Sequence, residues 1–257
     1  MLVDTHTHLY SDQFSGDIKD VIQRSIDSNV DRLYLPAIDS KSHKAMLNLE
    51  DQFPEICIAM MGLHPCSVGD NYKKELREIE TWLGRRKWVA IGEIGLDFFW
   101  DKSYTTQQYE AFELQIKWAK ELDIPVVIHT RNATEEAIQL IEKWKDQKLR
   151  GIFHCFSGTA EQAKRVIDLG FYLGIGGVVT FKNGGLADVL KEVSLTDLVL
   201  ETDSPYLAPV PYRGKRNESC YLELIAQKVA DIYGTGMVEV SRVTSENANK
   251  IFGEFAF

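Results

Sequence analysis

A single-domain TIM (β/α)8 barrel spanning residues 1–257 is the fold that the sequence predicts. Short apolar runs rich in β-branched residues alternate with longer amphipathic, charged stretches, as expected for repeated βα units around a parallel sheet. Eight such runs fit within 257 residues, which is the usual size of one TIM barrel. No Pro/Ser-rich linker or low-complexity tract divides the chain, which favours one domain.

The predicted strands are short apolar runs, several of which end on His, Glu or Asp. They begin at Leu2, Val30, Glu55, Trp88, Pro125, Gly151, Phe171 and Leu198. Between them, apolar residues recur at helical spacing in Thr106–Leu122 and Thr134–Asp146. A doubly wound open sheet is the alternative fold, but no G-x-G-x-x-G turn follows the first run.

Charge and cysteine usage restrict the function class. A formal net charge of -9 argues against a broad basic face that coats duplex DNA, so any nucleic-acid contact must be local. Four scattered cysteines without a CxxC pair indicate neither a zinc ribbon nor a disulfide framework. No apolar run approaches the ~20 residues that span a bilayer, and no signal peptide is evident. We therefore expect a cytoplasmic protein without a membrane partner.

Histidines gather where TIM barrels place their active sites, at the carboxyl ends of the predicted strands. Five of the six lie there, His43 being the exception: His6, His8, His64, His129 and His154. His6 and His8 are two positions apart in a predicted strand, so both side chains face the same side and can bind one ion. A buried pair bonded to backbone is the alternative, but two adjacent neutral imidazoles favour metal ligation. Asp4, on the same face, is a candidate to orient one of them.

Carboxylates follow the fourth and eighth predicted strands. Glu93 ends an apolar run, where a carboxylate is costly unless it is paired or binds a cation. Asp97 is either a further ligand or a turn residue. Glu201 and Asp203 share a face of the last strand. Four histidines with two or three carboxylates exceed the needs of one tetrahedral ion, which indicates a two-metal site that activates water. Zn, Mn, Fe, Ni and Mg all suit such ligands.

The chain resembles the TatD family of metal-dependent deoxyribonucleases over its whole length. The matching segments are "DTHTHL", "GLHP", "IGEIGLD", "PVVIHTR", "FHCFSG", "ETDSPYLAP" and "RGKRNE". The resemblance implies a TIM barrel that hydrolyses phosphodiesters near DNA ends with two divalent ions. One ion would be held by His6, His8, Glu93 and Asp203, and the other by Glu93, His129 and His154. The resemblance also places His64 near the substrate phosphate and makes Glu201 a partner of a metal ligand.

Two departures from the family pattern concern loops expected to meet substrate. Ser219 replaces the usual proline after "RGKRNE", and "LDFFW" replaces a tyrosine-bearing version. Basic residues after strands 5, 7 and 8 are candidates to bind phosphates, with a solvated basic loop as the alternative. They are Arg131, Lys182, Arg213, Lys215 and Arg216. An aromatic from Phe98, Phe99 and Trp100, with Phe99 preferred, could stack on a terminal base, although ordinary loop packing would also account for these residues.

The resulting hypothesis is a monomeric deoxyribonuclease, exonucleolytic on single-stranded ends, with two divalent ions (Mg, Mn or Zn). Asp203 would orient or deprotonate the attacking water, with Glu93, His64 and Glu201 as the other catalytic candidates. A binuclear amidohydrolase and a carboxylic- or aminoacyl-ester hydrolase are the alternatives among enzymes. Many amidohydrolases bridge their metals with a carboxylated lysine on strand 4, where this chain has Glu93. A catalytically silent metal-binding scaffold is the alternative outside enzymes, and it predicts missing ligands.

Overall fold

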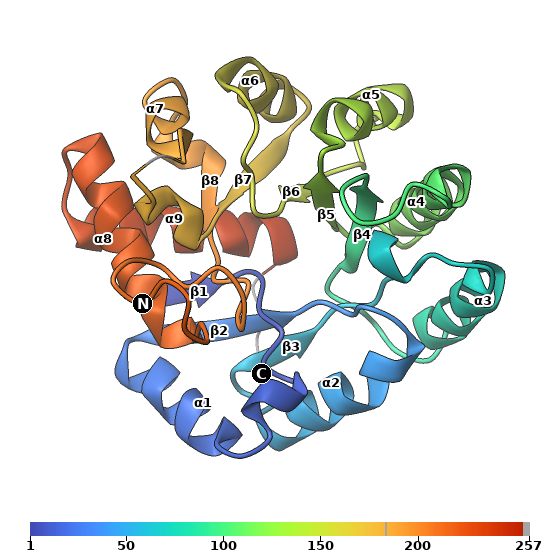
Figure 1. Ribbon diagram of the computed structural model, residues 1–257, viewed down its shortest axis with the longest axis horizontal. Helices are drawn as coiled ribbons and strands as arrows, with labels where there is room; N and C mark the ends of the chain where they lie inside the picture. The colour runs from blue at the N-terminus through green and yellow to red at the C-terminus, as the bar shows by residue number, and fades with distance from the viewer. Residues whose placement is uncertain (183, 254–257) are drawn as a thin grey trace.

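The computed structural model describes residues 1–182 and 184–253. Its parallel strands form an inner ring, and helices surround that ring (Figure 1), which confirms the predicted TIM barrel. The strands are β1 (Leu2–Asp4), β2 (Val30–Leu35), β3 (Cys57–Ala59), β4 (Ile91–Asp97), β5 (Val126–Arg131), β6 (Gly151–Phe153), β7 (Phe171–Ile175) and β8 (Leu198–Leu200). All eight predicted strands are present, and most end earlier than their apolar runs.

The strands pair in sequence order, as β1-β2-β3 and β4-β5-β6-β7-β8, and every pair is parallel. Backbone hydrogen bonds cross both gaps between these sheets. Gly92 N donates to Met61 O at 3.0 Å between β3 and β4. Thr5 N donates to Leu200 O at 3.0 Å between β8 and β1. The two sheets therefore follow one another around the ring.

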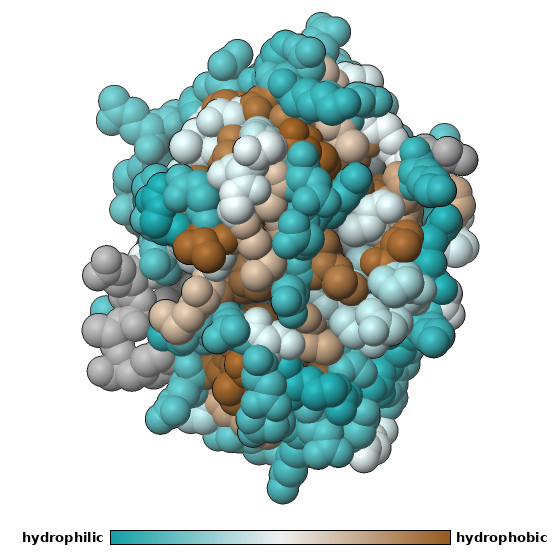
Figure 2. Space-filling model, turned by 90° about the vertical axis from the view of Figure 1, so that its left-hand side faces the viewer, coloured by the Kyte–Doolittle hydropathy of each residue, from teal (hydrophilic) through white to brown (hydrophobic). Residues whose placement is uncertain are grey.

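Amphipathic helices cover the outside of the strands. They are α1 (Ile18–Asp27), α2 (Ser40–Gln52), α3 (Tyr72–Leu83), α4 (Thr105–Leu122), α5 (Thr134–Trp144), α6 (Ala160–Asp168), α7 (Leu186–Leu190), α8 (Leu222–Tyr233) and α9 (Met237–Phe252). The two helices predicted from apolar spacing are α4 and α5. The latter ends two residues early, because Asp146 accepts the backbone N–H groups of Lys148 and Leu149 in a turn. On the side that carries α7 and α8, hydrophilic residues interrupt the hydrophobic patches (Figure 2).

Alternation along the strands divides the apolar residues into two cores. In β5, Val126 and Ile128 belong to the large core beneath the helices, whereas Val127 belongs to a smaller cluster inside the ring. The inner cluster also contains Ile251 and Phe252 of α9. Phe252 stacks on Tyr34 with 4.0 Å between ring centroids. Thus α9 closes the inner core at one end.

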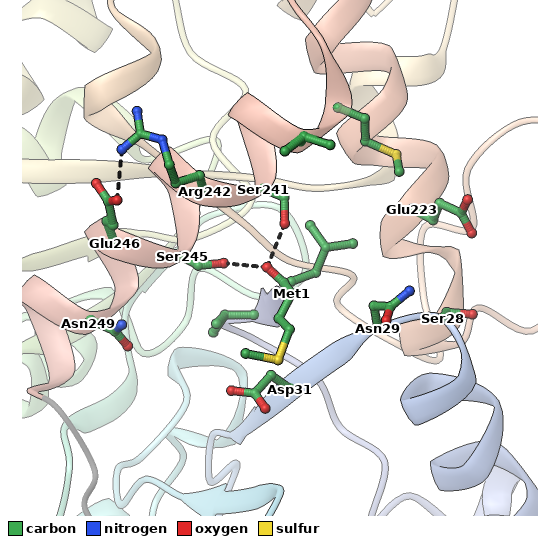
Figure 3. A pocket seen from close by; sticks show the side chains of 14 residues that line it. Met1, Ser28, Asn29, Asp31, Glu223, Ser241, Arg242, Ser245, Glu246 and Asn249 are labelled. Atoms are coloured by element: carbon green, nitrogen blue, oxygen red, sulfur yellow. Dashed lines mark hydrogen bonds and ion pairs between the residues drawn. The ribbon is translucent and has the colours of Figure 1, made fainter.

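The end that α9 closes is the amino end of the strands. Asn247 of α9 donates to the carbonyl of Leu198, the first residue of β8, at 2.8 Å. The hydroxyls of Ser241 and Ser245 both donate to the carbonyl of Met1, just before β1 (Figure 3). The carboxyl end of the strands is left for a site. Within the described part of the chain, no helix has the length and apolarity to cross a membrane.

Candidate metal centre

Strand alternation carries polar side chains from the inner core to the carboxyl end of the ring. Val127, Ile152 and Val199 lie in the inner cluster. Two positions later come His129, within β5, and His154 and Glu201, each the first residue after its strand, so alternation extended by one residue brings all three to the same side as the inner cluster. The strong local preference of the apolar runs for β structure thus positions two imidazoles and a carboxylate above the core.

His6 and His8 lie beyond β1, which ends at Asp4, so strand spacing does not account for their convergence. Their Nε2 atoms are nevertheless 3.2 Å apart. The backbone of this segment is bonded to β2 on one side and to the segment after β8 on the other. Thr7 N donates to Tyr34 O at 3.0 Å, and His8 N donates to Ser204 O at 2.7 Å. The prediction that both imidazoles converge agrees with the geometry, whereas its reason, alternation within a strand, was wrong.

Asp203 also departs from strand geometry. It follows β8 with φ 55°, in the left-handed region that aspartate tolerates better than most residues. Glu201 and Asp203 therefore do not share a face through simple alternation, contrary to the prediction. The turn brings Asp203 Oδ1 to 3.6 Å from His8 Nε2 and 3.9 Å from His6 Nε2.

Asp4 does not orient an imidazole, which corrects the role expected for it. Its Oδ1 accepts the backbone N–H of His6 at 3.3 Å and of Thr202 at 2.9 Å. Its Oδ2 accepts the Thr202 hydroxyl at 2.6 Å. Asp4 thus ties the segment after β1 to the segment after β8 through backbone. Burial raises the pKa of Asp4 to about 7, against the lowering effect of these hydrogen bonds.

Glu93 lies at the centre of a cluster with His6, His8, His129, His154 and Asp203, which we call the Glu93 cluster. Its two oxygens face different histidines. Oε2 is 3.2 Å from His6 Nε2 and 3.6 Å from His8 Nε2. Oε1 is 2.9 Å from His129 Nδ1 and 3.4 Å from His154 Nε2. The carboxylate is buried, with 2% of its surface exposed. A carboxylate in this position can bridge two cations.

Hydrogen-bond partners behind the imidazoles fix which nitrogen faces the cluster. Tyr10 donates its hydroxyl proton to Pro36 O at 2.6 Å, so it must accept from His8 Nδ1 at 2.8 Å. The Nε2 of His8 consequently presents a lone pair toward Glu93. Asp97 Oδ2 lies 3.0 Å from His129 Nε2, which leaves His129 Nδ1 for Glu93. Partners of this kind commonly orient metal-ligating histidines.

Glu201 lies beside His154 and is bonded to the backbone that follows it. Glu201 Oε1 accepts the backbone N–H of Cys155 at 2.6 Å and lies 3.0 Å from His154 Nδ1, without the alignment of a hydrogen bond. Gly174 makes room for this carboxylate, because a Cβ there would overlap Glu201 Oε2. Burial raises the pKa of Glu201 to about 7.

His64 differs from the other four imidazoles. Its Nδ1 accepts the backbone N–H of Cys66 at 3.0 Å, so the proton of the neutral ring is on Nε2. That Nε2 lies 3.5 Å from Glu93 Oε1. A ring nitrogen of His64 also lies within 4.8 Å of a ring nitrogen of His129. A protonated Nε2 cannot bind a metal through a lone pair, but it can donate a hydrogen bond to a phosphate oxygen.

Burial keeps three of the histidines neutral, but not His129. Burial lowers the pKa of His6 and His8, and that of His154 to about 3, so these rings are neutral as ligands require. Burial also opposes charge on His129, but hydrogen bonds to Asp97 and Glu93 outweigh it and raise its pKa to about 9.

The two carboxylates of the cluster have opposite shifts. Burial disfavours the charge on Glu93, yet the surrounding histidines and the His129 hydrogen bond hold its pKa well below the usual range. Burial and the neighbouring Glu93 raise the pKa of Asp203 well above the usual range. Neutral imidazole lone pairs and converging carboxylates form a donor set that fits divalent cations. Three buried atoms of these side chains have no hydrogen-bond partner: His6 Nδ1, His154 Nδ1 and Glu201 Oε2.

A cavity of about 960 Å³ opens above the cluster. Three carboxylates line it, Glu93, Asp97 and Asp203, together with three cationic residues. The cationic residues are Arg131, Arg213 and Lys215. The lining therefore has as many Arg and Lys side chains as carboxylates, and bound divalent cations would make the cavity positive and suited to a polyanion.

Other predicted substrate contacts lie elsewhere. Lys182 is exposed and is outside the described residues that line this cavity. Arg216 does not face the cavity, because its guanidinium is bonded to Asp17 and Glu218. Ser219 is fully buried and donates to Thr7 Oγ1 at 3.3 Å, so it does not meet substrate.

The three aromatic residues after β4 have different surroundings. Phe98 packs against the large core. Phe99 is half exposed and lies beside the cavity wall, in contact with Arg131. Trp100 lines the cavity itself and is 69% exposed. The structure therefore places Trp100, rather than the preferred Phe99, at the cavity.

A second cavity, of about 550 Å³, lies at the amino end of the barrel between α8, α9 and Met1 (Figure 3). Its polar side chains largely bond to one another or to backbone. Arg242 pairs with Glu239 and Glu246, and the serines bond to Met1. Among the described residues that line it there is no histidine or cysteine, so its lining lacks the chemistry of the Glu93 cluster.

Sequence reasoning did not find Tyr10, the Cys66 backbone N–H or the space at Gly174. Tyr10 continues the alternate spacing of His6 and His8, so the "HTHLY" segment held a signal for it. The other two depend on the packing of segments distant in sequence, and no local pattern indicates them.

Comparison with known proteins agrees with this geometry. Residues 3–253 match the family model of TatD related DNases. The chain is 38% identical to the uncharacterized metal-dependent hydrolase YabD of Bacillus subtilis, covering 98% of this chain and 99% of that protein. It is 32% identical to the 3'-5' ssDNA/RNA exonuclease TatD of Pantoea ananatis, covering 98% and 99% of the two chains.

Solved structures show the same relationship. The crystal structure of YjjV, a TatD homologue from Escherichia coli K12, superposes with a TM-score of 0.93 at 28% identity. The match covers 99% of this chain and 98% of that one. With the family model spanning the barrel and metal-dependent hydrolases among its relatives, the chain belongs to the TatD family of metal-dependent hydrolases.

Proposed function

We propose that this chain is a deoxyribonuclease that removes nucleotides from single-stranded DNA ends with two divalent ions. The observation that carries the proposal is the division of Glu93 between two histidine pairs, one oxygen toward His6 and His8 and the other toward His129 and His154. His6, His8 and Asp203 would hold one ion, and His129 and His154 would hold the other. Glu93 would be a ligand of both. Mg, Mn and Zn are all compatible with these ligands.

Two divalent ions bound there would supply a nucleophilic water at neutral pH and neutralise charge on the phosphoryl oxygens. The chain's own groups perform the remaining tasks. Asp203 lines the cavity, and its Oδ1 lies 3.6 Å from His8 Nε2, so its carboxylate is placed to orient the attacking water and accept its proton. His64 is placed to donate its Nε2 proton to a phosphate oxygen. Glu201 accepts the backbone N–H of Cys155, the residue after His154, and so helps to position that segment.

The cationic residues on the cavity wall support a phosphodiester substrate. Arg131, Arg213 and Lys215 can bind phosphates on either side of the scissile bond. The Pantoea ananatis relative, named as a 3'-5' ssDNA/RNA exonuclease, supports a nucleic-acid substrate with a free end. A DNA strand with unpaired bases suits a cavity of about 960 Å³ better than a rigid duplex.

We also propose that the chain acts as a monomer in the cytoplasm. Every residue of the Glu93 cluster comes from this one chain, so the site is complete without a second copy. The four cysteines are free thiols, which suits a reducing compartment.

The test is digestion of 5'-labelled oligonucleotides by purified protein that has been stripped of metal and reloaded with one ion at a time. We expect stepwise shortening of single strands, slower attack on blunt duplexes, and no cleavage without metal. Internal cuts, or hydrolysis of a carboxylic ester without any DNA cleavage, would overturn the proposal.

Two variants separate chemistry from binding in this assay. Asp203→Asn should lower kcat at least ~100-fold, the usual loss for a catalytic proton acceptor. Asp188→Asn, which alters an exposed acid on α7, is the control.

Arg213→Ala should mainly raise KM and weaken its salt dependence. Arg242→Ala on α9 is the matched control for loss of a surface arginine.

A further inference from the structure

A stack of three side chains stands at the rim of the cavity, next to the Glu93 cluster. Arg131 Cζ lies 3.8 Å from the ring centroid of Phe99 and 5.1 Å from that of Trp100. Phe99 and Trp100 meet edge to face with 4.9 Å between centroids. We call these three residues the rim stack. Arg131 is two positions after His129 on β5, so the stack begins on a strand that also supplies the cluster.

One carboxylate connects the rim stack to the cluster. Asp97 Oδ1 accepts the backbone N–H groups of Phe99 at 2.9 Å and Trp100 at 3.3 Å. Its Oδ2 lies 3.0 Å from His129 Nε2. The backbone of Asp97 is held in turn by the side chain of Gln108, with bonds of 2.9 and 3.1 Å. The loop is therefore positioned by the same group that orients a candidate metal ligand.

All three members of the rim stack are exposed, and Trp100 exposes more of its surface (69%) than Phe99 (48%). Its side chain borders the 960 Å³ cavity and also a smaller one of about 210 Å³. With 69% of its surface exposed, the indole presents a large apolar area that packing within the chain does not use. A flat aromatic surface of this kind, beside a guanidinium that can bind phosphate, matches the two parts of a nucleotide.

We propose that Trp100 is a stacking platform for an unpaired nucleobase of the DNA end, with Arg131 binding the adjoining phosphate. This inference rests on the proposed nuclease function. A base in a duplex has both faces covered by its neighbours, so only a frayed or single-stranded end can occupy the platform. The rim stack would thus give the enzyme its preference for unpaired ends, independently of base identity.

The test compares Trp100→Ala and Trp100→Phe with the parent protein on two single-stranded oligonucleotides. One carries ordinary nucleotides, and the other carries abasic residues at the terminal positions of both ends. Trp100→Ala should raise KM for the ordinary strand roughly 5- to 100-fold and leave kcat within about twofold. It should leave KM for the abasic strand unchanged, and Trp100→Phe should retain most of the parent KM.

Val238→Ala is the matched control, because Val238 is 82% exposed on α9, at the opposite end of the barrel. Thermal unfolding followed by circular dichroism should give equal melting temperatures for all four proteins and reports correct folding. An equal effect of Trp100→Ala on both oligonucleotides, or no effect on either, would overturn the platform. Failure of the proposed function has a different signature, since the parent protein would then cleave neither strand.

Discussion

Asp97 Oδ2 lies 3.0 Å from His129 Nε2, so the carboxylate holds the ring with Nδ1 turned toward Glu93. Asp97→Asn should disrupt this arrangement, because one amide oxygen cannot accept from both His129 and the loop N–H groups. We expect affinity for one of the two ions to fall about 10- to 100-fold. Metal titration by calorimetry measures it, and Asp101→Asn, in the same loop, is the control. Unchanged affinity for both ions would show that His129 needs no such partner.

Gly174 is expected to tolerate no side chain, since a Cβ would overlap the Glu201 carboxylate. Gly174→Ala should lower the free energy of unfolding by about 1–3 kcal/mol, as overpacking of a filled site does. Thermal unfolding measures the change. Gly236→Ala is the matched control, because a Cβ there meets no atom within 4 Å. Equal melting temperatures for the two variants would contradict the close packing at Glu201.

Metal removal should destabilise the protein. Glu93, Asp203 and Glu201 lie close together in a buried site, and ions that bind only the folded state add stability by mass action. At a free metal concentration of ~100 Kd the gain is about 2.7 kcal/mol. Differential scanning calorimetry with a chelator, and then with excess metal, measures the shift. A melting temperature that does not respond to either addition would rule out tight binding to the native state.

Metal affinity should fall as the pH falls. In the metal-free protein the hydrogen bonds to Asp97 and Glu93 raise the pKa of His129 to about 9, so its Nδ1 carries a proton at pH 7. An ion that takes this nitrogen must displace the proton, and below pH 9 affinity should drop by up to ~10-fold per pH unit for that proton. Calorimetry in buffers of different ionisation enthalpy counts the released protons. Metal binding without proton release at pH 7 would contradict this protonation state.

The sequence predicted the barrel and the six converging residues for one physical reason. Polar side chains directly after buried apolar runs must emerge at the carboxyl ends of parallel strands, and His129 and His154 follow that rule. His6 and Asp203 converge for another reason, because their segments lie beyond the strands and are joined through the Asp203 N–H and the His6 carbonyl, at 2.9 Å.

The remaining features depend on contacts between distant segments. Asp4 and Thr202 are bonded although they are 198 positions apart, and Arg216 is bonded to Asp17 rather than facing substrate. A basic loop residue has the same sequence signature whether it binds a phosphate or a nearby carboxylate. Only the position of Asp17 in the fold decides between these roles for Arg216.

The shared carboxylate of Glu93 is tested most directly by electron paramagnetic resonance of the manganese-loaded protein. The parent should bind two Mn²⁺ per chain, about 3.5 to 4 Å apart, and give the spectrum of an exchange-coupled pair. Glu93→Gln should lose the coupling, with no more than one tightly bound ion. A parent that binds one ion per chain, or two ions with independent spectra, would contradict a metal pair bridged by Glu93.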